Sequence, residues 1–190
     1  MRLSYSHSHI PFLSLPSTQH SHTRVPLPPP PPTRNPFPPD NTEFLEASLK
    51  AVDRGVTPWV VAHFHRPMYC TQSSSCDKGA AHLRAQAEDI MYDNKVDLTL
   101  CGHVHAYQRS NPVYKGAVVP GAPVYIMQGA SGNREGNDGP YSPDQPAFIA
   151  NSQSVFGYGI LTIAADGQSL GWAFYDSASN AMLDSATYTK

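Results

Sequence analysis

Two short runs of the sequence place histidines directly after a stretch that resembles a buried strand. One is His103-Val104-His105, which follows the apolar residues 98–101 and Gly102. Side chains of an extended chain alternate between its two faces, so both imidazoles of this pair are expected to point the same way. Imidazole is a common ligand for zinc, iron, copper and nickel. The spacing therefore favours a metal site, although one packed and one hydrogen-bonded histidine would also account for it.

A second histidine-bearing run lies upstream. The largely apolar residues 58–64 lead into His65, and Pro67 follows. Ligands of α/β proteins bind at the carboxyl ends of parallel strands, so His65 and the later pair are predicted to face one crevice. His63 would lie on the same strand face as His65, either as another ligand or as a packed histidine beside the site.

The segments around these histidines alternate between helical and strand patterns. Asp40 and Glu43 form a capping signal for a helix that Gly55 ends. A strand–helix–strand order favours parallel pairing with a right-handed crossover. The predicted strands are residues 58–64, 98–101 and 123–128, with a helix at 79–93. Residues 129–153 are predicted to be loop, and antiparallel strands are expected at 159–164, 169–175 and 182–188.

Composition excludes several classes of function. The formal net charge is −2, so no basic surface indicates nucleic acid or an anionic membrane as a partner. No apolar run approaches the roughly twenty residues that span a bilayer, and the chain is predicted to be soluble. Eleven of the nineteen prolines lie before residue 40, five of them in a row at 28–32. Residues 1–39 are therefore predicted to be disordered, and the short, interrupted apolar run at 10–15 does not predict a signal peptide.

These motifs resemble the purple acid phosphatases of the calcineurin-like metallophosphoesterase superfamily. In that family one strand ends in His-x-Pro-x-Tyr, and Asn-Lys-Val-Asp precedes a strand that ends in Gly-His-x-His-x-Tyr-x-Arg. The same patterns stand here at residues 65–69, 94–97 and 102–109. The family's Gly-Asn-x-Glu-Gly loop after a Pro-Val-Tyr-Ile strand is matched at 123–136. The resemblance covers about residues 43–178 and none of the segment before residue 40.

The resemblance implies an α/β fold: the C-terminal part of a metallophosphoesterase β-sandwich with flanking helices, ending in antiparallel strands. Residues 1–39 would be a disordered proline-rich segment, 40–115 the C-terminal part of the catalytic domain, and 116–190 the C-terminal region. A secreted or vacuolar location is also implied. In such a compartment Cys70 and Cys76 would form a disulfide, whereas in a reducing one they would be free thiols.

The resemblance also implies a ligand set. His65 and His103 would bind an exchangeable divalent ion (Fe, Zn or Mn), and His105 would bind Fe(III). His82 would approach the phosphate as a catalytic residue, or else face solvent on its helix.

Three residues after the histidine pair are expected to play supporting parts. Tyr107 and Arg109 would orient the histidine loop rather than contact substrate. Gln108 stands where glutamate is common in the family, which would remove a possible charge partner of Arg109.

The implied reaction is hydrolysis of small phosphate monoesters by a dinuclear metal centre. The family's other ligands lie in Asp-x-Gly, Gly-Asp-x-x-Tyr and Gly-Asn-His motifs, and none of these precedes residue 43. We interpret the chain as the carboxyl-terminal half of such an enzyme, with a partner chain or dimer as one way to complete it. The alternatives are an inactive truncated remnant with at most weak metal binding, and an adaptor that uses the prolines at 28–32.

Overall fold

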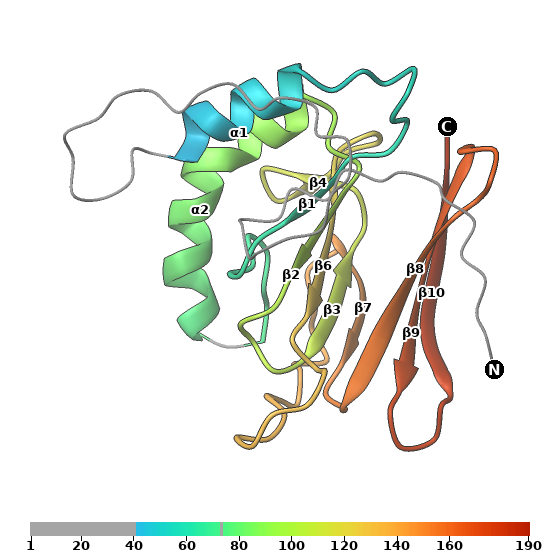
Figure 1. Ribbon diagram of the computed structural model, residues 1–190. Coiled ribbons are helices and arrows are strands. Elements are labelled where there is room, and N and C mark those ends of the chain that lie inside the picture. Colours follow the sequence, from blue (N-terminus) through green and yellow to red (C-terminus); the bar gives the residue numbers. More distant parts are fainter. Residues whose placement is uncertain (1–40, 73) are drawn as a thin grey trace.

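A computed structural model describes residues 41–72 and 74–190 in three layers (Figure 1). Helices α1 (Asn41–Lys50) and α2 (Ser74–Asp93) cover one face of a five-stranded sheet, and a three-stranded sheet covers its other face. The predicted α/β class with flanking helices is therefore confirmed. The disorder expected for residues 1–39 concerns residues outside those described.

The five-stranded sheet has the order β1-β2-β6-β3-β7. Its strands β1 (Val61–His63), β2 (Leu98–Cys101) and β6 (Val124–Gln128) are parallel. Parallel pairing was predicted for β1 and β2, and the parallel direction of β6 is a finding of the structure. Strands β3 (Tyr107–Ser110) and β7 (Ile149–Gln153) are antiparallel to their neighbours. The prediction of loop throughout 129–153 is thus wrong for β7, whose polar sequence suits an edge position with solvent on one side.

The second sheet contains the three antiparallel strands that the sequence predicted. They are β8 (Gly157–Ile163), β9 (Ser169–Asp176) and β10 (Met182–Thr189), in the order β10-β9-β8. Gly167 and Asn180 adopt positive φ in the two connecting turns, a conformation that these residue types tolerate well. A hairpin of β4 (Val113–Tyr114) and β5 (Ala117–Val118) was not expected.

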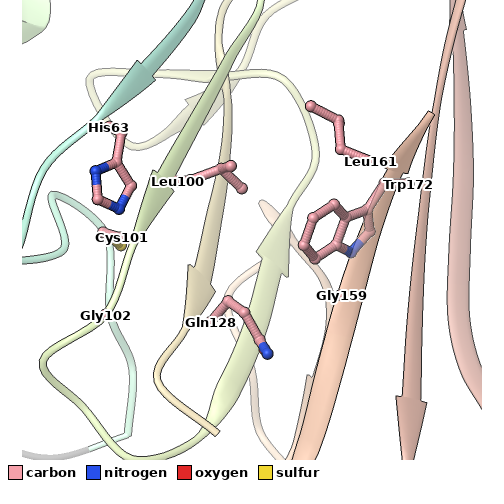
Figure 2. Close-up of a pocket in the computed structure, with 8 residues that line it drawn as sticks. All are labelled: His63, Leu100, Cys101, Gly102, Gln128, Gly159, Leu161 and Trp172. Carbon is pink, nitrogen blue, oxygen red and sulfur yellow. The ribbon is translucent and has the colours of Figure 1, made fainter. Parts of the chain in front are cut away.

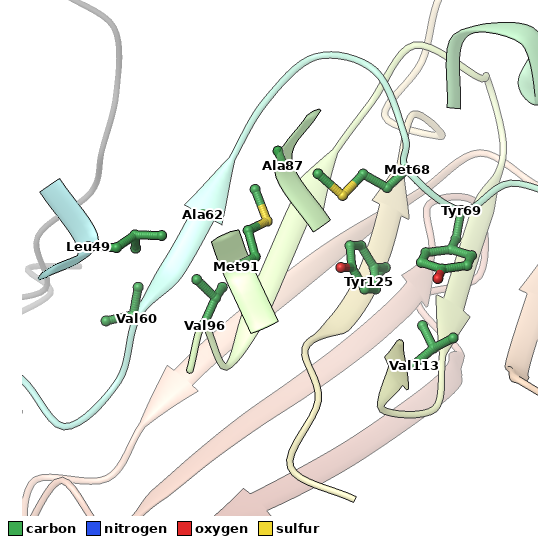
Figure 3. Close-up of a cluster of buried hydrophobic side chains, with 10 residues drawn as sticks. All are labelled: Leu49, Val60, Ala62, Met68, Tyr69, Ala87, Met91, Val96, Val113 and Tyr125. Carbon is green, nitrogen blue, oxygen red and sulfur yellow. The ribbon is translucent and has the colours of Figure 1, made fainter. Parts of the chain in front are cut away.

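Two apolar cores hold the three layers together. Because side chains alternate along a strand, Val60 and Ala62 face the helices while Trp59 and Val61 face the second sheet. Figure 3 shows the helix-side core: Leu49, Val60, Ala62, Met68, Tyr69, Ala87, Met91, Val96, Val113 and Tyr125. The core between the sheets contains Trp59, Val61, Leu98, Tyr107, Val124, Ile126, Ala130, Leu170, Trp172 and Phe174. The parallel strands are therefore covered on both faces, which explains their continuous apolar runs.

Three further features bear on the sequence predictions. Cys70 and Cys76 form a disulfide, and Cys101 is a buried free thiol. Within residues 41–72 and 74–190, no helix is long and apolar enough to cross a membrane. The five-stranded sheet takes strands from both sides of residue 115, and the domain boundary expected there stays a prediction.

Candidate metal centre

The carboxyl ends of β1 and β2 bring His65 and His103 together. Nε2 of His65 lies 3.1 Å from Nδ1 of His103, and the two rings cross at 74°. The backbone amide of Gly102 donates to the His65 carbonyl at 3.1 Å, which joins the two strand ends. The backbone of His103 has a positive φ, in the left-handed region. That region costs a non-glycine residue roughly 1 kcal/mol or more, so a strained turn presents this imidazole to its partner.

The separation of the two nitrogens suits a shared metal ion. Two nitrogens bound to a tetrahedral zinc at about 2.0–2.1 Å lie roughly 3.3 Å from each other. A hydrogen bond between the rings would have a similar length. Desolvation, followed by the positive charge of Arg66, lowers the pKa of His103. The ring is therefore neutral near pH 7, which is the form that binds metal.

His105 is held separately by a glycine-rich loop, residues 129–139. Its Nδ1 lies 3.6 Å from Oε2 of Glu135, and its backbone amide donates to Oδ2 of Asp138 at 2.7 Å. The Asp138 amide donates back to the His105 carbonyl at 2.9 Å. A Cβ on Gly129 would lie 1.8 Å from the Val104 carbonyl oxygen. Only glycine, which has no Cβ, therefore lets this loop start so close to the histidines.

The structure thus brings together two of the three predicted ligands. In the part of the chain that the structure covers, no group of three or more His, Cys, Asp or Glu side chains could hold a metal ion. His105 therefore does not join His65 and His103 as a third ligand of one ion. The metal-binding roles of all three histidines stay predictions.

The other two candidate histidines lie elsewhere. His82 is exposed on α2, and its catalytic role stays a prediction. His63 is also exposed, and it lines a pocket of about 290 Å³ beside β8 and β9 (Figure 2). β1 ends at His63, so the strand alternation from which a shared face with His65 was predicted does not extend beyond it. The pocket is completed by Leu100, Cys101, Gly102, Gln128, Gly159, Leu161 and Trp172.

Tyr107 and Arg109 connect the strand after the histidines to the second sheet. The Tyr107 hydroxyl donates to Oδ2 of Asp184 at 2.5 Å and accepts from Nε1 of Trp172 at 2.8 Å. Arg109 donates to both Asp184 oxygens, from Nε at 2.6 Å and from Nη2 at 2.8 Å. Burial raises the pKa of Tyr107, which stays protonated as a donor. These contacts anchor the strand after the histidines to the second sheet, and the role of Tyr107 and Arg109 in orienting the histidine loop stays a prediction.

Asp184 was missed by sequence reasoning. The sequence signal for it was an acidic residue in a strand whose alternate side chains face the core. Its partner Arg109 lies 75 residues away, so local patterns do not connect the two. The expectation that Gln108 deprives Arg109 of a charge partner is wrong. Adjacent strand residues face opposite sides, so Gln108 points away and accepts from the Thr71 amide at 3.1 Å.

Two family models match the chain. The model of the calcineurin-like phosphoesterases matches residues 7–107, and that of iron/zinc purple acid phosphatase-like protein C matches residues 122–185. The first match begins well before residue 40, so the expectation that the resemblance excludes that segment is wrong.

Curated relatives are acid phosphatases. The chain is 37% identical over 124 residues to purple acid phosphatase 21 of Arabidopsis thaliana, with 65% of this chain and 28% of that protein covered. It is 38% identical over 156 residues to acid phosphatase A of Cryphonectria parasitica, with 78% of this chain and 30% of that protein covered. The chain therefore spans roughly 30% of the length of the curated relatives it matches.

Solved structures show the same fold. The chain is similar to purple acid phosphatase PPD1 from yellow lupin seeds, with a TM-score of 0.68, 23% identity, and 77% of this chain and 28% of that chain covered. It is also similar to GAP50, the anchor in the inner membrane complex of Plasmodium, with a TM-score of 0.58 and 15% identity. This similarity covers 79% of this chain and 41% of that chain. Because the phosphoesterase model alone matches more than half of its residues, the chain belongs to the calcineurin-like phosphoesterases, among the purple acid phosphatases.

Proposed function

We propose that this chain forms the carboxyl-terminal part of an acid phosphatase that hydrolyses small phosphate monoesters with bound metal ions. The observation that carries the proposal is the convergence of the His65 and His103 nitrogens, 3.1 Å apart at the ends of neighbouring parallel strands. Family membership supports the same chemistry.

The histidine pair fits part of one metal site. His65 and His103 would hold a divalent Fe, Zn or Mn ion, and His105 would contribute to a separate Fe(III) site. Bound ions of this kind act as Lewis acids and generate hydroxide from water. The described residues supply no set of three ligands, so they do not fit a complete dinuclear centre.

Further ligands would come with polypeptide that covers the open side of the sandwich. β1 and β8 are each the last strand of their sheet and pair on one edge only in the described part of the chain. The pocket with His63 of β1 and Leu161 of β8 lies between them (Figure 2). Unpaired strand edges readily accept another strand. We infer that a further segment of the protein, a partner chain or a second copy pairs at these edges.

The location that we propose is secreted or vacuolar. The Cys70–Cys76 disulfide supports it, because disulfides persist in oxidising compartments and are rare in the cytosol.

Metal binding and turnover test the proposal separately. Zinc affinity is measured by competition with a chromophoric chelator, and turnover is followed with a chromogenic phosphomonoester at acidic pH. His65→Ala and His103→Ala should each weaken zinc binding at least tenfold and abolish turnover. His82→Ala, on exposed α2, is the matched control for zinc binding and should leave that affinity unchanged.

A non-catalytic remnant is the second candidate, favoured by the lack of a third ligand in the described residues. It predicts at most weak zinc binding that depends on the two histidines, and no turnover that these substitutions change. Zinc binding that both alanine variants retain would contradict the two readings alike.

A further inference from the structure

Two cationic side chains stand out because they lack a partner. Of the lysine and arginine side chains that the structure describes, only Arg66 and Arg134 form no ion pair, cation–π contact or hydrogen bond with another described residue. Arg66 directly follows His65, and Arg134 precedes Glu135, which contacts His105. The unpaired positive charge thus belongs to the two segments that hold the candidate ligands.

The backbone around Arg66 is fixed while its side chain is exposed. On one side, the His65 carbonyl accepts the hydrogen bond from Gly102. On the other, Pro67 is buried and has a restricted φ, and Met68 is completely buried in the helix-side core. The guanidinium therefore projects from a rigid segment into solvent beside the histidine pair.

The place of Arg66 relative to the pair follows from the chain. Arg66 directly follows His65, whose Nε2 lies 3.1 Å from Nδ1 of His103. Because Arg66 is exposed and forms no hydrogen bond with either ring in the described residues, we place its guanidinium at the rim of the pair. A cation there disfavours a bare metal ion and favours an anion close by.

We propose that Arg66 binds a second phosphate or carboxylate group of the substrate while the reacting phosphate lies at His65 and His103. This assignment deepens the proposed function and rests on it. A guanidinium offers a planar fork of donors that matches phosphate and carboxylate oxygens. The preferred substrates would be monoesters with a second anionic group, such as bisphosphates and phosphorylated acids, over simple phenyl phosphates.

Anion binding to the metal-free chain tests the assignment without turnover. Inorganic phosphate and pyrophosphate are titrated at constant pH while the imidazole signals of His65 and His103 are followed by NMR. The wild-type chain should bind pyrophosphate at least fivefold more tightly than phosphate. Arg66→Gln should remove most of that preference, and Arg66→Lys should keep part of it. Lys50→Gln removes one charge from exposed α1 and should leave the preference unchanged.

Three results would overturn the assignment: a wild-type chain without the preference, an Arg66→Gln variant that keeps it, or a Lys50→Gln variant that also loses it. Turnover then separates this inference from the proposed function. In an active enzyme, Arg66→Gln should reduce kcat/KM at least fivefold more for a sugar bisphosphate, a monoester with a second phosphate, than for p-nitrophenyl phosphate. Equal losses on both substrates would refute a rim role. If the wild type turns over neither substrate but the pyrophosphate preference depends on Arg66, the phosphatase proposal fails and the anion site stands.

Discussion

Replacing Asp184 with alanine is expected to lower the free energy of unfolding by about 3–5 kcal/mol. Asp184 is 8% exposed, and its carboxylate accepts hydrogen bonds from the Tyr107 hydroxyl and from two nitrogens of Arg109. The Arg109 and Asp184 side chains are 12% and 6% exposed. Alanine would therefore leave a buried guanidinium without a counter-charge, and solvent would compensate it only slightly.

Two further variants separate charge from packing. Asp184→Asn keeps the shape and one acceptor oxygen but loses the charge, so we expect a loss of about 2 kcal/mol. Arg109→Met combined with Asp184→Leu removes both charges at once. Apolar replacement of a buried ion pair is often close to neutral, and only the Tyr107 hydroxyl is left without its acceptor. The double variant should therefore lose only about 1–2 kcal/mol.

Equilibrium urea unfolding followed by tryptophan fluorescence measures these differences. The chain has two tryptophans, Trp59 and Trp172, and both are buried in the core between the sheets. Their emission therefore reports the separation of the layers that Asp184 joins. A loss below about 1 kcal/mol for Asp184→Ala would show that the pair behaves like a surface ion pair. A double variant as unstable as Asp184→Ala would refute the uncompensated charge as the cause.

Three smaller predictions use other contacts. Gly129→Ala would put its Cβ against a carbonyl of the histidine loop. It should cost about 1–3 kcal/mol in the same urea experiment, and wild-type stability would contradict the close approach. Reduction of the disulfide between Cys70 and Cys76 should destabilise the fold. Urea unfolding with and without reductant measures this effect, and a Cys70→Ser variant is the control. The expected loss of unfolding free energy is about 2 kcal/mol, at the low end for disulfides because the closed loop is short, and equal stability with and without reductant would contradict it. The amide and hydroxyl of Ser179 lower the pKa of Asp176. The turn that contains Asp176 should therefore be stabilised at pH values above the ordinary aspartate pKa. This stabilisation should be lost as the pH falls through the lowered pKa of Asp176. An NMR titration in which Asp176 shows the ordinary aspartate pKa would contradict the prediction.

The sequence predicted those parts of the fold that local patterns encode. Residues 98–101 and 124–128 are buried on both faces, and this burial makes their apolar runs continuous. The three strands after residue 156 are covered on one face and exposed on the other, so alternation and turn residues marked them. Placing His65 and His103 at strand ends required only the periodicity of those strands and their parallel order.

Contacts between distant residues were not predictable in the same way. β7 is a polar edge strand, and its pairing with β3 depends on the rest of the sheet rather than on its own residues. The Arg109–Asp184 pair depends on how the two sheets stack. The separation of His105 from His103 has a local cause. The two imidazoles were predicted to point the same way because the chain was assumed to be extended, but the positive φ of His103 interrupts the alternation between them.

That turn also bears on what limits metal affinity. The positive φ of His103 lies between two fixed contacts, because Gly102 is hydrogen-bonded to His65 on one side and the loop beginning at Gly129 packs on the other. The two nitrogens lie at a separation that one ion could bridge, so we expect little reorganisation if an ion binds. The affinity of such a site would then depend mainly on how many further ligands reach this pair. Polypeptide pairing at the edges of β1 and β8 would thus increase metal affinity by adding ligands, without rearranging the histidines.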